Sequence, residues 1–179
     1  DDALRSIVTV ALNTGMRLGE ILGLQWDCID PEHRRIVVKR TLSKNGIRET
    51  TKTNLVRYIP MNNTLLELFS NRKRQRTKGV SFTPFVFIDK RGNPFRPAHF
   101  TSRDFGSLVS SAGIPSLRFH DLRHTYASQF IMAGGSLYDL QKILGHTKIE
   151  MTARYAHLSQ AHLQKAALLI EFGRKKPEQ

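Results

Sequence analysis

Residues 120–124 read His-Asp-Leu-Arg-His, and this short segment decides the fold. On a helix, His120, Arg123 and His124 stand at positions i, i+3 and i+4 and share one face. Apolar side chains recur on the opposite side of the same helix, at Leu122, Tyr126, Phe130 and Ala133. We therefore predict a helix over about residues 121–133 that buries its apolar side and turns a polar stripe to a cleft or to solvent.

Hydrophobic periodicity predicts further helices on both sides of this segment. Apolar residues at helical spacing predict them over about residues 4–12, 18–24, 63–70, 97–112, 136–144, 147–157 and 159–172. Asn63 is expected to cap the third of these helices, and Pro97 to begin the fourth, which should bury Leu108 and Ala112. The basic run at about residues 72–78 is expected to form an exposed helix end and a loop, and Tyr155 to lie on a short helix.

The sequence pattern in the middle of the chain predicts a small antiparallel sheet. Residues 35–40 are rich in β-branched side chains, Asn45-Gly46 is a hairpin signal, and a further strand is expected near residues 56–59. A short strand is also expected over residues 85–88. The chain is therefore predicted to be mainly α with a small antiparallel β-sheet, an α+β fold.

Composition restricts the classes of protein that the chain can belong to. Its 179 residues suit one packed domain, and 28 Lys and Arg against 15 Asp and Glu give a net charge of +13, which indicates a polyanionic partner. The single cysteine, Cys28, excludes an intrachain disulfide and fits a reducing compartment. No apolar run reaches the roughly 20 residues of a membrane span, and no signal peptide is expected. We expect a soluble intracellular protein and a fragment of a longer chain.

Four motifs, in this order along the chain, resemble the tyrosine recombinase (phage integrase) family. Residues 14–20, Thr-Gly-Met-Arg-Leu-Gly-Glu, resemble its first arginine box, and residues 52–60 are similar to its lysine strand-turn. Residues 120–125 resemble its second arginine box, and Leu144-Gly145-His146 followed by Tyr155 resembles the end of that box. Any one motif is weak evidence, whereas the ordered set spans nearly the whole chain.

The resemblance implies a nucleophile and two phosphate-binding arginines. Tyr155 would attack the scissile phosphate of DNA and leave a 3′-phosphotyrosine and a free 5′-hydroxyl. Arg17 and Arg123 would hold the non-bridging oxygens, where the forked guanidinium suits the transition-state charge better than an ammonium does.

The resemblance also assigns the proton transfers. Lys52 would be the general acid that protonates the 5′-oxygen, His120 a proton acceptor or donor, and His146 a further hydrogen-bond donor to the phosphate. Two supporting residues complete the site. Glu20 would orient the first arginine box or the His120 region, and His124 would support the helix start or touch the backbone.

No metal and no cofactor are expected, because fixed cations replace the metal and the covalent link conserves the phosphodiester energy. A zinc site built on His120 and His124 is an alternative, but Asp121 stands where the metalloprotease motif has Glu, and no cysteine cluster is present. Two further alternatives are a DNA-binding module that does no chemistry and a topoisomerase-like relaxing enzyme. Covalent attachment to DNA would separate the first of these from a recombinase.

The remaining expectations concern domains and partners. The catalytic domain is expected over residues 1–173, with a polar tail over 174–179 and without the family's N-terminal core-binding domain. The resemblance implies double-stranded DNA as partner, a homo-tetramer on DNA formed through the C-terminal helix, a DNA-bending host factor, a directionality factor, and a bacterial, cytoplasmic, nucleoid-associated enzyme of a prophage or mobile element. Candidate contacts to the DNA backbone are Arg72, Lys73, Arg74, Arg76 and Lys78.

Overall fold

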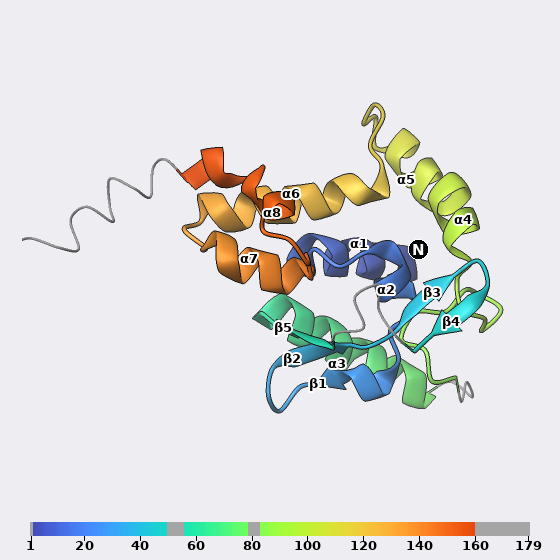
Figure 1. The fold of residues 1–179 in the computed structure, drawn as a ribbon. Coiled ribbons are helices and arrows are strands. Elements are labelled where there is room, and N and C mark those ends of the chain that lie inside the picture. The colour runs from blue at the N-terminus through green and yellow to red at the C-terminus, as the bar shows by residue number, and fades with distance from the viewer. Residues whose placement is uncertain (1, 50–55, 79–82, 160–179) are drawn as a thin grey trace, which may run out of the picture.

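The structure is a computed structural model, and it describes residues 2–49, 56–78 and 83–159. Most of its regular elements are helices (Figure 1). In chain order they are α1 (Asp2–Thr14), α2 (Leu18–Leu22), η1 (Trp26–Cys28), β1 (Ile29–Asp30), β2 (Arg35–Val38), β3 (Thr41–Ser43), β4 (Gly46–Arg48), β5 (Arg57–Pro60), α3 (Asn63–Lys78), α4 (Pro97–His99), the π-helical η2 (Phe100–Phe105), α5 (Gly106–Ser111), α6 (Phe119–Met132), α7 (Leu137–Leu144), α8 (Glu150–Ala153) and η3 (Ala156–Ser159). The predicted α+β class is confirmed.

The strands form two small antiparallel sheets rather than the single sheet that was predicted. β2 lies between β1 and β5, with Ile36 opposite Ile59, whereas β3 and β4 form a separate hairpin. The strand predicted over residues 85–88 is wrong. This segment makes only isolated bridges, between Gln25 and Phe85 and between Ile88 and Pro94, because its partners are single residues of loops.

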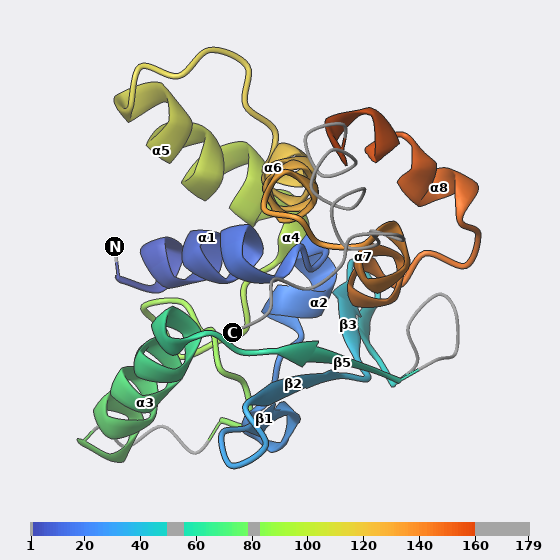
Figure 2. The ribbon, with the colours of Figure 1, turned by 90° about the vertical axis from the view of Figure 1, so that its left-hand side faces the viewer.

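The apolar side chains gather into two cores that α6 connects. The larger core lies between α1, α2, α3 and the three-stranded sheet, and it includes Ile7, Ile36 and Leu65. α6 contributes to this core at its start and to the smaller core further along. The smaller core consists of Ala127, Ile131, Leu140, Leu144 and Tyr155. Figure 2 looks along α6, with α1 beneath it and α7 and α8 to one side.

Gly15 closes α1 where the two cores meet. Its φ is +62°, which favours glycine, and a Cβ placed there would lie 2.6 Å from Tyr126 Cδ1 and 2.7 Å from Leu144 Cδ2. Any side chain would therefore push α1 away from α6 and α7. The glycine of the first arginine box thus has a packing reason in addition to its backbone conformation.

Several helix predictions need correction at their ends. α3 is capped by Asn62, whose side chain accepts from the backbone N–H of Leu65 at 3.0 Å, and not by Asn63. α3 also continues through the basic run, which is therefore helix and not loop. Pro97 begins α4 as predicted, but Leu108 and Ala112 on the following helix are exposed, because that helix packs by one narrow face only.

No helix in the described ranges is long and apolar enough to cross a membrane.

Candidate active site

The first arginine box forms the turn between α1 and α2. Arg17 stands just before α2 with φ −71° and ψ 149°, and its backbone N–H donates to Glu20 Oε2 at 2.8 Å. The Arg17 guanidinium donates from Nη1 to Glu20 Oε1 at 3.1 Å. Glu20 therefore both caps α2 and orients Arg17. The Arg17 side chain remains 36% exposed, so its guanidinium can still reach a ligand.

Glu20 is also bound by an arginine of β5. Arg57 donates from Nη1 and Nη2 to the two carboxylate oxygens at 2.9 and 2.6 Å, a bidentate pair between side chains that are 10% and 3% exposed. Burial raises the pKa of the Glu20 carboxyl, but the hydrogen bonds and charges of Arg57 and Arg17 outweigh burial and leave the pKa below its ordinary value. Glu20 is thus ionised and fixes the two arginines relative to one another.

Arg123 of the second arginine box is buried and ties distant segments together. Its Nη1 donates to the Gly15 carbonyl at 2.6 Å, and its Nη2 donates to the Leu144 carbonyl at 2.8 Å. Burial first, and then the positive charge of Arg17, lower the pKa of Arg123 to about 10, so the guanidinium stays charged at neutral pH. Because one carbonyl belongs to the Arg17 turn and the other to the turn that carries His146, Arg123 holds both turns at the site.

The end of α7 positions His146. Gly145 takes the left-handed φ of +67° that ends the helix, and His146 follows it directly. His146 Nδ1 lies 2.9 Å from the hydroxyl oxygen of Thr152, a fully buried side chain of α8. Burial first, and then the charges of Arg123 and Arg17, lower the pKa of His146 to about 4. The ring is therefore neutral at neutral pH. Its Nδ1 contacts the Thr152 hydroxyl, and its Nε2 takes no part in that contact.

Tyr155 lies in the turn between α8 and η3, not on a helix as predicted. Its ring is 6% exposed and belongs to the smaller core, and its hydroxyl lies 2.5 Å from His124 Nδ1. The sequence analysis did not predict this contact between His124 and the tyrosine. Burial raises the pKa of the Tyr155 phenol, although Arg154 and Arg123 act against burial. The phenol is consequently protonated at neutral pH.

His120 lies beside a cavity between the arginine boxes. Its ring meets the ring of His124 edge to face, with centroids 4.9 Å apart. Burial first, and then the charge of His124, lower the pKa of His120 below its ordinary value. The cavity is lined by Met16, Arg17, Phe105, Phe119, His120 and Arg123. Arg118 lines it as well, so three arginines and a histidine border one hollow.

The structure brings together five of the six predicted catalytic residues: Arg17, His120, Arg123, His146 and Tyr155. The sixth, Lys52, lies outside the described residues. Arg57 is the residue of this network that the sequence analysis did not identify. A signal for it exists, because Arg57 and the buried Ile59 share one face of β5, and a charged residue on a buried face requires a partner.

The predicted DNA-backbone contacts on α3 lie away from this network. α3 and α8 stand on opposite sides of the molecule in both ribbon views (Figures 1 and 2). Arg72 is turned inward, with hydrogen bonds from Nη1 to Asp2 and Ser6, and Arg76 lies over the Trp26 ring. Lys73 and Arg74 are exposed, and the Lys78 side chain is outside the described part. Arg72 therefore serves packing between α1 and α3.

The described ranges contain no group of three or more His, Cys, Asp and Glu side chains placed to hold a metal ion. His124, one of the two ligands in the zinc alternative, uses its Nδ1 in the contact with Tyr155. A catalytic zinc site requires about three protein ligands, so the geometry of these histidines does not favour zinc.

The fold and this constellation define a class of protein: residues 2–162 match the model of the phage integrase family, and the chain belongs to that family. Its fold is that of the tyrosine recombinase catalytic domain. The catalytic domain of bacteriophage HP1 integrase superimposes with a TM-score of 0.64 at 28% identity, over 91% of this chain and 79% of that one. The Tn1549 transposon integrase in complex with circular intermediate DNA gives a TM-score of 0.76 at 27% identity, over 90% of this chain and 59% of that one.

Relatives of known sequence are similar over most of this chain. The integrase of Salmonella phage P22 is 31% identical over 98% of this chain and 45% of its own length. A XerC-like tyrosine recombinase of Caldanaerobacter subterraneus subsp. tengcongensis is 28% identical over 87% of this chain and 46% of its own length. The chain thus spans about half the length of these relatives.

Proposed function

We propose that this chain is the catalytic domain of a site-specific DNA recombinase that cleaves and rejoins strands through a 3′-phosphotyrosyl intermediate. One observation carries the proposal. Arg123 binds the carbonyls of Gly15 and Leu144, and its neighbour His124 binds Tyr155, so the two arginine boxes, the His146 turn and the tyrosine converge on one residue pair of α6. Binding DNA without chemistry requires no tyrosine at this point.

The chemistry begins at the Tyr155 hydroxyl. Its Oη attacks the scissile phosphorus, an O–P bond forms, and the bond from phosphorus to the 5′-oxygen breaks. The 5′-oxygen leaves as a hydroxyl after it takes a proton from the general acid, for which the family resemblance suggests Lys52. Attack by an incoming 5′-hydroxyl reverses these steps and needs no nucleotide cofactor, because the phosphotyrosine conserves the bond energy.

The two arginines stabilise the charge on the non-bridging oxygens. A guanidinium has five N–H donors. Arg123 donates one N–H from each of its two terminal nitrogens to a backbone carbonyl, so its remaining N–H groups can donate to a phosphate. Arg17 offers the same group at the same cavity. Because both arginines are held by protein groups before DNA arrives, little reorganisation is needed when the charge develops.

His146 supplies a neutral hydrogen-bond donor. We assign the Thr152 hydroxyl as the donor to Nδ1, so the ring proton lies on Nε2 and can be given to a phosphate oxygen. The lowered pKa of His146 keeps it in this neutral form in the absence of DNA. A phosphate that binds nearby would favour the charged ring and strengthen the contact.

The biological setting follows from the relatives. The net charge of +13 and a structural neighbour in complex with DNA support double-stranded DNA as the partner. Integration or excision of a prophage or mobile element is the role that the phage and transposon integrases favour. Assembly as a tetramer on DNA, with helper proteins and in the bacterial cytoplasm, completes the proposal.

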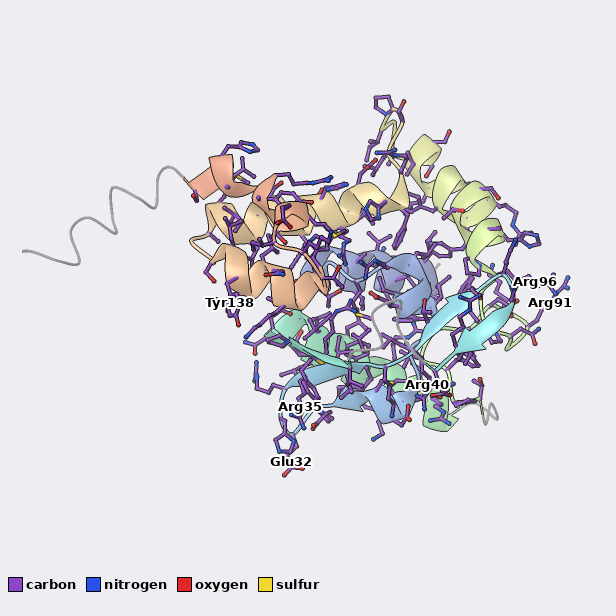
Figure 3. The ribbon with its side chains drawn as sticks, in the orientation of Figure 1. Glu32, Arg35, Arg40, Arg91, Arg96 and Tyr138 are labelled. Atoms are coloured by element: carbon purple, nitrogen blue, oxygen red, sulfur yellow. The ribbon has the colours of Figure 1, made fainter. Side chains whose placement is uncertain are left out.

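A covalent-trapping assay tests the proposed chemistry. The substrate is a nicked duplex that loses a short 5′-hydroxyl fragment after cleavage, with its sequence selected from a randomised pool by covalent capture with the wild-type chain. We expect a slower band on a denaturing gel for the wild type and none for Tyr155→Phe. Tyr138→Phe is the matched control, because Tyr138 is 61% exposed at the start of α7 (Figure 3), and it should react as the wild type does.

Two results of this assay would count against the proposal. A covalent band that survives in Tyr155→Phe would remove Tyr155 as the nucleophile. If the wild-type chain captures no duplex from the pool, the chain does not carry the strand-cleaving activity.

A further inference from the structure

The contact between His124 and Tyr155 joins α6 to the turn that carries the tyrosine. His124 Nδ1 and Tyr155 Oη are 2.5 Å apart, and the ring centroids are 6.1 Å apart at a tilt of 44°. The two residues come from α6 and from the turn after α8, so tertiary packing and not sequence proximity creates the contact. The Tyr155 ring is fixed by the smaller core around it. The phenolic hydroxyl is thus directed at one imidazole nitrogen.

We propose that His124 is the proton acceptor for the nucleophile: its Nδ1 takes the phenolic proton as Tyr155 Oη attacks phosphorus. This inference rests on the proposed strand-cleaving function and adds to it. As the O–P bond forms, the proton passes from Oη to Nδ1 and the 5′-oxygen departs with a proton from the general acid. On rejoining, the proton on His124 Nδ1 returns to Oη as the phosphotyrosine bond breaks.

The position of His120 separates its task from that of His124. His120 lines the cavity together with Arg17 and Arg123, where a phosphate would be bound. His124 is not among the side chains that line this cavity. Its ring meets the His120 ring edge to face, with centroids 4.9 Å apart, and its Nδ1 contacts the Tyr155 hydroxyl. The two histidines of the second arginine box therefore face two different reactants, the phosphate and the nucleophile.

Groups around His124 suit a ring that becomes charged for one step. The carboxylate of Asp121, on the preceding turn of α6, lies close enough for its charge to interact with His124. The neighbouring His120 ring has a pKa below its ordinary value and so remains neutral beside an imidazolium. A neutral His124 must carry its proton on Nε2 in the resting protein, because Nδ1 can accept from the phenol only through its lone pair.

Substitution by asparagine separates proton transfer from simple positioning. Asn places an amide oxygen near the position of Nδ1, so His124→Asn keeps an acceptor for the phenol but cannot take its proton at neutral pH. We expect the rate of covalent-complex formation to fall by about 10²- to 10⁴-fold in His124→Asn, the usual contribution of a general base. A residue that only positions Tyr155 would be replaced by asparagine with little loss.

Two chemical substitutions make the test specific. A 5′-bridging phosphorothiolate has a leaving group that needs no proton, so it should restore the rate of a variant that lacks the general acid but not that of His124→Asn. Incorporation of a fluorinated tyrosine at position 155 lowers the pKa of the phenol, and it should restore part of the rate to His124→Asn. A variant that has lost only the correct position of Tyr155 should recover its rate with neither substitution.

The outcomes are distinguishable from failure of the proposed function. If the wild type forms the covalent complex and His124→Asn forms it at the same rate, His124 is not the proton acceptor and the inference is overturned. Nitrogen NMR of the histidine rings gives a second test that needs no DNA. A proton on Nδ1 of His124 in the wild type would also overturn the inference, whereas a proton on Nε2, with a Nδ1 signal that changes in Tyr155→Phe, supports it.

Discussion

The two sides of the candidate site are held by different forces. On the arginine side, Glu20 and Arg123 are buried and the Arg57 side chain is 10% exposed. Ion pairs and hydrogen bonds to backbone carbonyls connect these residues to other segments of the chain. On the tyrosine side, Tyr155 and Thr152 depend on a small apolar core and on one hydrogen bond each to a histidine. The groups that would bind phosphate are therefore fixed by strong interactions, and the nucleophile by weaker ones.

This difference has a mechanistic meaning. An arginine that stabilises transition-state charge is most effective when its donors are already in place, because moving charged groups during the reaction costs free energy. A nucleophile that must form and break a bond to phosphorus has to move by a bond length or more. The small core and the single hydrogen bonds around Tyr155 allow that movement without disturbing the arginines. Substitutions on the arginine side should consequently cost more stability than substitutions on the tyrosine side.

The largest effect is expected from removing one partner of the buried ion pair. Arg57→Met leaves the Glu20 carboxylate buried without its bidentate partner, and we expect the free energy of unfolding to fall by about 3–5 kcal/mol. Urea unfolding followed by circular dichroism measures it. Arg35→Met is the matched control: Arg35 also lies in the three-stranded sheet but pairs with Asp30 at the surface (Figure 3), and its loss should cost no more than about 1 kcal/mol.

The double variant Arg57→Met with Glu20→Met decides whether the loss comes from the uncompensated charge. It should be more stable than Arg57→Met alone, because it removes a buried carboxylate that keeps only its bonds to Arg17. Equal effects of Arg57→Met and Arg35→Met would mean that the arginine side is no more firmly held than the surface.

The second largest effect is expected from replacing the guanidinium group of Arg123. Lysine keeps the charge but cannot bind the carbonyls of Gly15 and Leu144 together, so Arg123→Lys should destabilise the fold by about 1–3 kcal/mol. Covalent-complex formation should also fall, by about 10²- to 10³-fold, because an oriented donor to the developing charge is lost. Measuring both quantities on one preparation gives the comparison. A lysine variant that retains the wild-type cleavage rate would show that Arg123 does not contact the phosphate.

The sequence predicted the residues of the arginine side better than their contacts. Gly15, Arg17 and Arg123 stand in recognisable motifs, and the periodicity around them correctly placed α1, α2 and α6. The role of Arg57 could not be predicted, because its Nε binds the carbonyl of Ile143, 86 residues away, and no local pattern specifies such a contact. Its only signal is a charge on the buried face of β5.

The tyrosine side was less predictable. The motif identified Tyr155, but the partner of its hydroxyl depends on how α8 packs against α6, and the sequence alone suggested a local role for His124. The basic run on α3 shows the same limit. Its composition predicted exposed cations, whereas Arg72 lies against α1 and the carbonyl of Val86, because the helix continues and turns that position inward.

A smaller effect is expected from the hydroxyl that holds His146. Thr152→Val keeps the shape of a fully buried side chain but leaves His146 Nδ1 without its donor, and it should reduce stability by about 1–2 kcal/mol. Cleavage should fall by a larger factor than in Thr152→Ser, which keeps the hydroxyl. Thr125→Val, at an exposed threonine of α6, is the control for the chemical change itself. If Val and Ser at position 152 cleave equally, the hydroxyl does not set the orientation of His146.

The smallest effect is a pH dependence that joins the two sides. Burial first, and then the charges of Arg123 and Arg17, lower the pKa of folded His146 to about 4, below its ordinary value of 6.5. The unfolded chain therefore takes up this proton at a higher pH than the folded protein does. The contribution of His146 to stability is therefore complete above pH 6.5 and is lost as the pH falls toward 4. Since the ring is partly exposed, solvent screening should keep the loss below about 1 kcal/mol.

His146→Asn isolates this contribution. Between pH 7 and pH 5 the wild type should lose more free energy of unfolding than the variant, and the difference between the two losses is the effect of His146 alone. Added sulfate, which would bind between Arg17 and Arg123 as a phosphate does, should reduce that difference, because it offsets the positive charge that the ring experiences. An identical pH dependence in both proteins would mean that neither burial nor the arginine charges lower the pKa of His146, and the two sides would then be electrostatically independent although Arg123 binds segments of both.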